Sequence, residues 1–440
     1  MALDGLMRKK AFTAKKAPGY LYGILLLLPL ALYYFSVYLF AENIPLSDDF
    51  SSVLGFLGSF LSAESFSEKI KLLFSQLNEH RIVFNRLVSL LVFKVNGCMD
   101  FKLLLYAGNL LLLPAIYAVY LSFKKKSEKV KYFLPAIIIL TVPQFTGSMF
   151  WATSAVQNIS CLAFSLLALV LLRKEGLFRE LSAFSFAVLA VLASGNGLFV
   201  LPAAISCLFI VKRNSSAFWW TAASALLYIL YFYGYTVPVH DKLYYAVKPE
   251  SVLEFFFVFL GSPVVLNVFY MKNLFGSSAE TIMRIFCALI GAGVVTYFIF
   301  LIKKKYYRLN PAIFTIFILF FLTAFAAAVT RSGIGPMQAF ASRYRVIPVF
   351  IFALVYISFI ELYKENTVNR YYKYLLILAV LFSVFSYIAN LPEIKYCRNN
   401  LVKGITSWQK DGTGLNILHD DPVYAGKLLK KSVEKGLYLK

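Results

Sequence analysis

The sequence predicts an all-α, polytopic membrane protein, and two features of its composition predict it. Of the 440 residues, 60% are hydrophobic and only 15% are charged. A soluble chain carries about a quarter charged residues, so this chain has too few to cover a globule of its size. The apolar residues also form blocks, such as residues 20–40, 103–121 and 311–328, close to the roughly 20 residues that a helix needs to cross a bilayer. A soluble enzyme, a disordered chain, a secreted disulfide scaffold and a membrane β-barrel are excluded.

Clusters of basic residues between the apolar blocks predict how the chain crosses the membrane. Basic residues collect in short cytoplasmic loops, which accounts for the net charge of +22 without nucleic acid as a partner. The first apolar block follows a basic stretch and is too long for a cleaved signal peptide, so the N-terminus is expected in the cytoplasm. Placing every later basic cluster inside predicts about eleven crossings and an external C-terminus. The predicted crossings are residues 20–41, 102–122, 132–149, 158–172, 181–193, 197–211, 217–236, 284–302, 311–330, 345–362 and 374–390.

One further apolar block, residues 252–271, does not fit a crossing. It lies between a crossing that ends outside and one that begins outside, and Gly261-Ser262-Pro263 interrupts it. A re-entrant hairpin or a helix on the membrane surface satisfies the count. Irregular backbone at membrane depth persists only where protein or a water-filled cavity surrounds it, so the break is predicted to line a cavity.

The chain is predicted to form one transmembrane domain, residues 1–390, and a small external cap, residues 391–440. The long first external loop, residues 42–100, has apolar residues at helical spacing after Phe50. This pattern predicts an amphipathic helix that rests on the membrane surface, followed by a polar cluster and a second apolar helix.

The cysteines give no sign of a metal site, because no Cys or His spacing resembles a metal motif. Three of the five lie inside apolar blocks. Cys98 and Cys397 lie in polar segments predicted on one side of the membrane, where an oxidising compartment would permit a disulfide.

An acidic pair, Asp48-Asp49, follows the first crossing directly. One carboxylate can cap the helix that follows, since Asp accepts hydrogen bonds from the first helical turn. The second is not needed for capping and can act as a general base that takes a proton from an attacking hydroxyl. Both residues are candidate catalytic groups, and Asp49 is preferred because Asp48 can be the cap.

The polar cluster Asn78-Glu79-His80-Arg81 stands at the end of the first loop. Its simplest interpretation is a solvated turn between two surface helices. In a chain this poor in charge it also suggests anion binding, with His80 or Arg81 on a phosphate and Glu79 orienting them.

A second cationic cluster comprises Arg331 and the segment Ser342-Arg343-Tyr344-Arg345. These arginines could simply reach lipid headgroups. Positive charge is normally kept off external loops, however, and arginine offers a planar fork that suits phosphate. Arg343 is the preferred phosphate ligand, with Tyr344 donating a hydrogen bond, and Arg345 is expected on a carboxylate or a headgroup.

Weaker signals for sugar hydroxyls are also predicted on the external side. Gln157 and Trp151 flank one hairpin, Asn196 lies in the next, and His240 follows the seventh crossing. Trp at a membrane interface is more often only an anchor.

The order of these features resembles the GT-C superfamily of integral membrane glycosyltransferases. More narrowly, it resembles bacterial members with Asp-Asp-Phe/Trp after the first crossing, here Asp48-Asp49-Phe50, and Asn-Glu-His-Arg at the end of the first loop. The segments at residues 342–344 and 421–425 are also similar. The resemblance covers nearly the whole chain in layout but few residues in motif, and the small C-terminal tail departs from the large soluble domain of bigger members.

This resemblance implies an inverting glycosyltransferase of the bacterial inner membrane, with its active site on the periplasmic face. An Asp of the first loop would deprotonate an acceptor hydroxyl, which attacks the anomeric carbon of a polyprenyl-phosphate sugar, and arginines would stabilise the departing phosphate. The acceptor would be an envelope glycan or a lipid-linked glycan such as O-antigen, and neither a metal nor another cofactor is expected. The implied sites are Asp49 and Asp48 for catalysis; Arg343, Tyr344, Arg345, Arg81 and His80 for the donor phosphate; and Glu79, Asn78, Gln157, Asn196 and His240 for substrate.

Three other functions remain open at this point. A flippase or transporter for lipid-linked glycans would share the architecture and the anionic ligand, but transporters commonly carry ionisable residues near the bilayer midplane. The predicted crossings are almost free of such charge. A glycan polymerase or ligase also places arginines in external loops, whereas a membrane scaffold would not need the acidic pair with the arginines.

Overall fold

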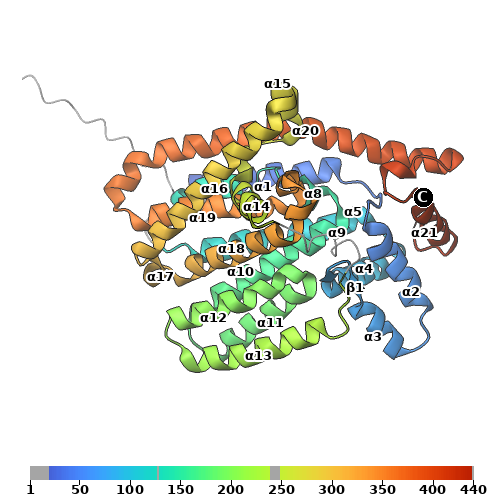
Figure 1. Cartoon of the computed structure of the whole chain (residues 1–440), viewed down its shortest axis with the longest axis horizontal. Helices are drawn as coiled ribbons and strands as arrows, with labels where there is room; N and C mark the ends of the chain where they lie inside the picture. The colour runs from blue at the N-terminus through green and yellow to red at the C-terminus, as the bar shows by residue number, and fades with distance from the viewer. Residues whose placement is uncertain (1–18, 126–127, 238–247, 439–440) are drawn as a thin grey trace, which may run out of the picture.

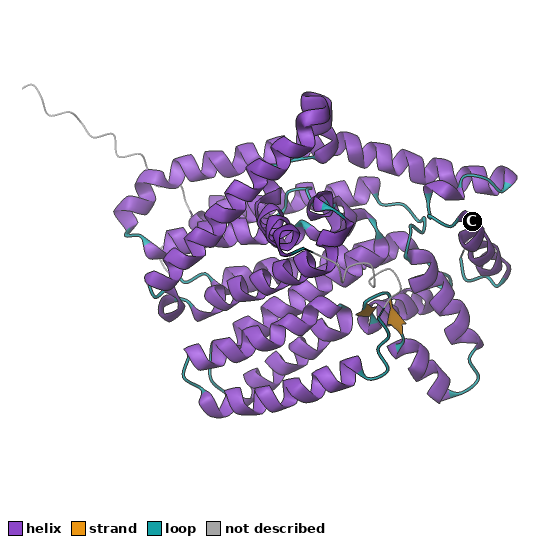
Figure 2. Cartoon of the chain, in the orientation of Figure 1, coloured by secondary structure: helices purple, strands orange, loops and turns teal. Residues whose placement is uncertain are grey.

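The computed structural model describes residues 19–125, 128–237 and 248–438, and these are almost entirely helical (Figure 2). The only strands among them are β1 (Gln76–Leu77) and β2 (His80–Arg81), which pair antiparallel in a small hairpin. The main helices pack into one bundle in which most, but not all, run in roughly the same direction (Figure 1). These helices are α1 (Gly19–Phe40), α5 (Phe101–Leu110), α6 (Leu112–Ser122), α7 (Lys129–Leu140), α10 (Ser160–Leu172), α11 (Leu177–Ala193), α12 (Val200–Ile210), α13 (Asn214–Phe232), α14 (Pro249–Gly261), α16 (Ala279–Lys303), α18 (Pro311–Arg331), α19 (Val346–Leu362) and α20 (Glu365–Asp411).

Within the described residues, six helical segments are long and apolar enough to cross a bilayer. This confirms the prediction of an all-α membrane protein. The six are Leu21–Phe40, Phe101–Ser122, Ala152–Leu172, Val268–Lys303, Pro311–Ile334 and Glu365–Asp411. The remaining predicted crossings fall on helices α7, α11, α12, α13 and α19, which have 11 to 19 residues each. Helix length and hydropathy therefore support six crossings, and the number eleven stays a prediction.

The centre of the bundle is formed by α10 and α18. The apolar windows that contain them are 78% and 61% buried, against 17% to 22% for the windows of α1, α16 and α20. Helix α10 carries apolar residues on all sides, as expected for a helix that is surrounded by other helices. The outer helices instead leave rows of Leu, Ile and Phe side chains exposed, which is the surface that a lipid environment requires.

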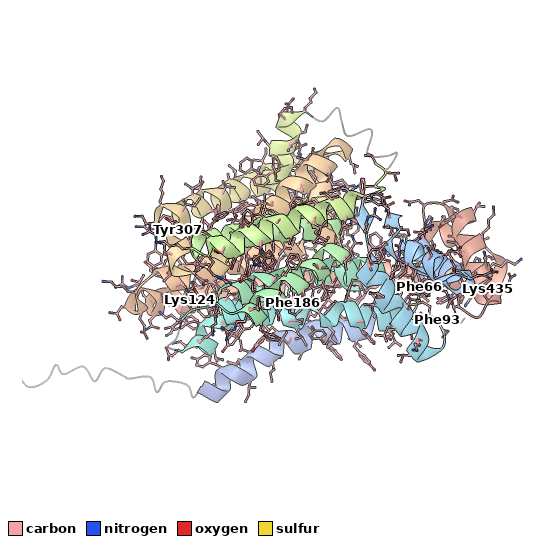
Figure 3. The ribbon with its side chains drawn as sticks, turned by 90° about the horizontal axis from the view of Figure 1, so that it is seen from below. Phe66, Phe93, Lys124, Phe186, Tyr307 and Lys435 are labelled. Atoms are coloured by element: carbon pink, nitrogen blue, oxygen red, sulfur yellow. The ribbon has the colours of Figure 1, made fainter. Side chains whose placement is uncertain are left out.

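The two ends of the bundle differ in composition. Figure 3 labels Lys124 and Tyr307 at one end and Phe66, Phe93 and Lys435 at the other. The second end holds the first loop and the C-terminus, and we call it the cap end. Basic clusters predicted on one side of the membrane, such as residues 303–305, thus lie at the end opposite the cap.

The first loop is folded tightly against the protein at the cap end. A wide, π-helical turn at residues 50–55 leads into α2 (Phe56–Ser62), and α3 (Phe66–Phe74), the hairpin and α4 (Val83–Asn96) follow. The predicted helix after Phe50 exists, but its apolar face is buried in protein instead of resting on a membrane. It is α3 that exposes its apolar side chains, with Phe66 78% exposed.

The domain boundary predicted at residue 390 falls inside a helix. Helix α20 runs unbroken for 47 residues and includes Pro392. Its last turns remain helical because the tail folds back on them: a short turn at residues 415–417 packs near Gly404, and α21 (Pro422–Glu434) follows at the cap end (Figure 1). The cap therefore grows out of α20 and is not separated from the bundle.

The break predicted at Gly261-Ser262-Pro263 is present, and α14 ends there in a tight turn. A Cβ on Gly261 would lie 2.0 Å from the Cys287 carbonyl oxygen of α16, so only glycine permits this close helix contact. Ser262 and Pro263 are buried, and the Pro263 carbonyl accepts a hydrogen bond from Gln144. Packed protein surrounds the break, and it does not line the cavities described below.

The orientation in the membrane can be tested with single cysteines. In a variant without native cysteines, Ser65→Cys at the cap end should react with an impermeant thiol reagent on intact cells, and Lys304→Cys at the opposite end should react only after permeabilisation, because both positions are exposed. Labelling of the Lys304 position alone would reverse the predicted orientation.

Candidate functional site

Two adjoining cavities lie at the cap end of the bundle. The first, which we call the polar cavity, has a volume of about 180 Å³. The second, which we call the apolar cavity, has a volume of about 210 Å³ and is walled by side chains of α10, α13, α18 and α19. The residues that line both cavities are Glu79, His80, Asn158, Asn196, Arg331, Arg343 and Tyr344.

The two residues of the acidic pair have different surroundings: Asp48 lies at the polar cavity and Asp49 lies in the protein interior. Asp48 lines the polar cavity together with Ser47. Asp49 is 1% exposed, and its Oδ1 accepts hydrogen bonds from the Thr153 amide (2.7 Å) and the Thr153 hydroxyl (2.5 Å). Its Oδ2 accepts one from the Leu46 amide at 3.0 Å. The preference for Asp49 as the reacting carboxylate is therefore reversed by the geometry, because the interior encloses Asp49 and leaves Asp48 at the cavity.

Burial also changes the acidity of Asp49. It raises the pKa of this carboxyl to about 7, against the three hydrogen bonds with Thr153 and Leu46, which lower it. The neighbouring Asp48 charge adds a smaller increase. A group held in this way serves to fix the turn that carries Asp48.

The polar cluster of the first loop reaches the cavities through the β1–β2 hairpin. Asn78 takes a positive φ of 48°, a conformation that Asn tolerates better than most residues, and the turn it makes brings Glu79 and His80 to the cavity wall. Glu79 forms an ion pair with Arg331 at the end of α18. His80 Nδ1 accepts a hydrogen bond from the Gly195 amide at 3.2 Å, and its Nε2 lies 3.6 Å from Glu79 Oε1.

Arg343 stands between two aromatic rings at the junction of the cavities. Its guanidinium carbon is 4.8 Å from the Tyr344 ring centre and 5.6 Å from that of Trp151. Hydrogen bonds from Ser148 and Asn158 to the Arg343 carbonyl hold its backbone in place. Burial raises the pKa of the Tyr344 phenol, but the charges of Arg343 and Arg331 outweigh this and lower it. A positive potential therefore exists here that favours an anion.

Two arginines predicted to bind phosphate serve the backbone instead. Arg81 donates to the carbonyls of Phe74, Tyr231 and Tyr233 at 2.6 to 2.7 Å and so ties the hairpin to the end of α13. Arg345 is buried and donates to the carbonyls of Phe340, Val265 and Leu266. Neither lines a cavity described here, so the geometry does not support a phosphate role for them. Carbonyl groups at irregular chain breaks need such donors, and arginine supplies several at once.

Of the remaining predicted site residues, three line the cavities and one lies outside the described residues. Gln157 and Asn78 line the polar cavity, and Asn196 lines both cavities. Gln157 and Asn158 lie on a π-helical turn, residues 155–159, and such turns are frequent at functional sites. His240 lies outside the described residues.

Thr153, which holds Asp49 of the acidic pair in place, was not predicted from the sequence. Thr153, in the short helix α9 (Ala152–Ser154), binds Asp49 through its amide and hydroxyl and accepts a hydrogen bond from Asn85 at its carbonyl. Nothing local in the sequence marks it, because its partners lie 68 to 104 residues away. Tyr231, which lines the apolar cavity, was also missed.

The cysteines and acids provide no metal site in the described part of the chain. No group of three or more His, Cys, Asp or Glu residues there could hold a metal ion. All five cysteines are free, so the disulfide between Cys98 and Cys397 is not formed.

Fold and site together define an all-α membrane protein with an acid-containing, arginine-rich cavity at one end of its helical bundle. Comparisons with protein-family models, with curated proteins and with solved structures found no match. The function is therefore argued from the side chains of this cavity.

The different surroundings of the two aspartates predict different responses of stability to pH. The raised pKa means that folded Asp49 holds its proton up to about pH 7, whereas the unfolded group loses it near pH 4, so its contribution to stability is full below pH 4 and falls as pH rises to about 7. Asp49→Asn removes this dependence and places an NH₂ group against the Leu46 amide, which costs about 1–3 kcal/mol. Melting temperatures of purified protein should therefore differ most near pH 4, and the gap should narrow towards pH 7.

Asp48→Asn is the matched control for this measurement. Its carboxylate faces the cavity, so we expect a change within about 0.5 kcal/mol. Parallel stability curves for the wild type and Asp49→Asn would contradict the burial argument.

Proposed function

We propose that the protein is an inverting glycosyltransferase that moves a sugar from a polyprenyl-phosphate donor to an acceptor hydroxyl. The observation that carries this proposal is that Asp48 shares the polar cavity with Arg331 and Arg343. A candidate base and a cation that can bind phosphate, in one cavity, provide the two groups that this transfer needs. The resemblance in motif order to GT-C enzymes of bacterial inner membranes supports the same reaction on the periplasmic face.

The apolar cavity is suited to the donor. Leu162, Leu198, Phe320 and Ile347 are among the side chains that wall it, and they offer a surface for an isoprenoid chain. At its polar end Arg343 and Tyr344 can contact the phosphate. The ion pair of Arg331 with Glu79 leaves the guanidinium of Arg343 as the cation free of an acidic partner among the described residues of this cavity. We therefore assign the donor phosphate to Arg343.

The chemistry would proceed in a single displacement. The acceptor hydroxyl gives its proton to Asp48 while its oxygen forms a bond to the anomeric carbon. The bond between that carbon and the phosphate oxygen breaks, and the phosphate leaves with the electron pair. Arg343 meets the negative charge that develops on the phosphate, and a fixed cation at the place where this charge develops stabilises the transition state.

A third cavity could admit the acceptor. It has a volume of about 270 Å³ and is lined by residues at the end of α1, by the helix α8 (Thr146–Phe150) and by α20. Trp151 lines both this cavity and the polar cavity, so its ring stands between them. Leu46 faces the third cavity while Ser47 and Asp48 face the polar one. An acceptor, here an envelope or lipid-linked glycan, would thus pass Trp151 to meet the base.

Asp48→Asn tests the assignment of the base. The amide keeps the size of the side chain but cannot take a proton, so conversion of polyprenyl-phosphate sugar to polyprenyl phosphate should fall about 10²- to 10⁴-fold. Mass spectrometry of the lipid products measures it, with Asp411→Asn, an exposed acid outside the cavities, as the control. Near-normal turnover of Asp48→Asn would remove Asp48 as the base.

Arg343→Lys tests the phosphate assignment. Lysine keeps the charge but loses the bidentate fork, which weakens stabilisation of the leaving phosphate by about 1–3 kcal/mol. Turnover at saturating donor should then fall about 5- to 150-fold. Arg345→Lys should lower the melting temperature while turnover per folded molecule changes little, because Arg345 binds only backbone carbonyls. Equal and small losses of turnover in both variants would contradict the assignment.

A further inference from the structure

A separate cleft lies at the cap end between the first loop and the C-terminal helix α21. Its volume is about 360 Å³. Its walls come from α2, from the corner between α3 and β1, from α4 and from α21. The cleft comes nearest to the acidic pair in sequence at Ser51, and it shares no lining residue with the polar or the apolar cavity.

The charge of this cleft is one-sided. Arg86 and Lys431 line it, and none of its described lining residues is acidic. The hydroxyl groups of Ser51, Ser59 and Ser75 each donate their hydrogen to a backbone carbonyl, so the charge of the cleft comes from its two cations. Two cations without a carboxylate make a surface that favours an anion over a cation or a neutral apolar ligand.

Arg86 is the unusual member, because it is a buried cation without a counter-ion. It is 4% exposed, and among the described residues it forms no ion pair. Its Nη1 donates to the carbonyls of Leu72, Leu73 and Ser75. Its Nε has no hydrogen-bond partner, and the guanidinium lies 5.2 Å from the centre of the Phe56 ring.

A buried charge of this kind is costly unless an opposite charge compensates it. Burial lowers the pKa of Arg86 to about 10, and the nearby Arg81 charge contributes to the decrease. The three carbonyls satisfy one nitrogen but carry no net charge. An anion in the adjoining cleft would supply the missing compensation, and Lys431 of α21, which also lines the cleft, offers a second cation.

We infer that this cleft is a second binding site, distinct from the proposed active site, for a phosphoryl group held between Arg86 and Lys431. The group could be the headgroup of an anionic lipid or a soluble phosphate ester, and the chemistry is the same for both. Because α21 forms one wall and α2 and α3 form the other, a bound phosphate would link the C-terminal helix to the first loop. The site stands on its own residues, so it does not depend on glycosyl transfer.

Binding in the cleft can be measured through the alkylation rate of a cysteine placed there. Ser59 is exposed and lines the cleft, so Ser59→Cys in a background without native cysteines gives a residue whose alkylation by a neutral maleimide can be followed. Protection is measured in neutral phosphatidylcholine nanodiscs with added inorganic pyrophosphate. The second arm uses nanodiscs that also contain phosphatidylglycerol, without pyrophosphate. Each rate is compared with that of the same variant without anion.

We expect at least one arm to slow alkylation, and the arm that does so identifies the source of the phosphate. Lys431→Gln removes one of the two cations. The pyrophosphate concentration, or the anionic-lipid content, that gives half-maximal protection should therefore increase by up to about fivefold, as expected for an exposed charge. Lys430→Gln, a neighbouring exposed lysine outside the cleft, should leave it unchanged. Arg343→Lys should also leave it unchanged, because that residue lies in the other cavities.

Arg86→Gln should abolish protection if the variant folds, but the inference does not rely on it. Absence of protection in both arms would overturn the site. Equal effects of Lys430→Gln and Lys431→Gln would also overturn it, because they would reduce the binding to general attraction by a basic surface. Failure of the proposed transfer reaction would leave these outcomes unaffected.

Discussion

The hydrogen bonds between Asp49 and Thr153 are the constraint on which the candidate site depends. They join the segment after α1 to α9, 104 residues further along the chain. Thr153 also shares a hydrogen bond with the Ser52 hydroxyl and accepts one from Asn85, so the turn after α1 and helix α4 of the first loop both converge on one residue. A carboxylate satisfied by three donors in the interior cannot rotate freely, and the turn that it fixes sets the direction of Asp48.

Arginine plays two physically different roles at the cap end. Arg81 and Arg345 each donate to three backbone carbonyls where the chain leaves regular helix. Those carbonyls would otherwise be left without donors, which is expensive in a membrane protein. Arg343 has its guanidinium between aromatic rings and at the cavity instead. The local sequence Arg343-Tyr344-Arg345 thus combines a residue available to a ligand with a residue that holds the backbone.

This division supports the proposed reaction in a specific way. A site in which every nearby arginine lacked an acidic partner would attract a phosphate strongly but would not fix its position. Here Glu79 offsets Arg331, and Arg343 remains as the cation that shares the polar cavity with Asp48, the proposed base. The cleft around Arg86 presents the reverse situation, since it contains two cations and no described acid. In the polar cavity and in the cleft alike, the cation without a carboxylate partner is the candidate ligand for an anion. An unpaired charge in a partly enclosed space attracts an ion of opposite sign.

The sequence by itself determined the class of protein and the position of its polar motifs along the chain. Blocks of apolar residues are a one-dimensional property, since a helix satisfies its own backbone groups and needs only length and hydropathy to suit a bilayer. For the same reason the helices of the first loop and the break at Gly261-Ser262-Pro263 could be predicted. The boundary at residue 390 could not, because the helix continues where the returning tail packs against it.

Only the tertiary structure decided that Asp48, and not the preferred Asp49, lies at the cavity, and only the structure showed that Arg345 binds backbone carbonyls. Asp48 and Asp49 are adjacent and chemically identical, and Arg343 and Arg345 are chemically identical and only two residues apart. Their directions are set by donors and carbonyls from distant segments, such as Thr153 for Asp49 and Val265 for Arg345. Neighbouring side chains point in different directions, so distant segments determine which of them is enclosed and which is left at the cavity. That choice is a property of three-dimensional packing, and no local pattern in the chain encodes it.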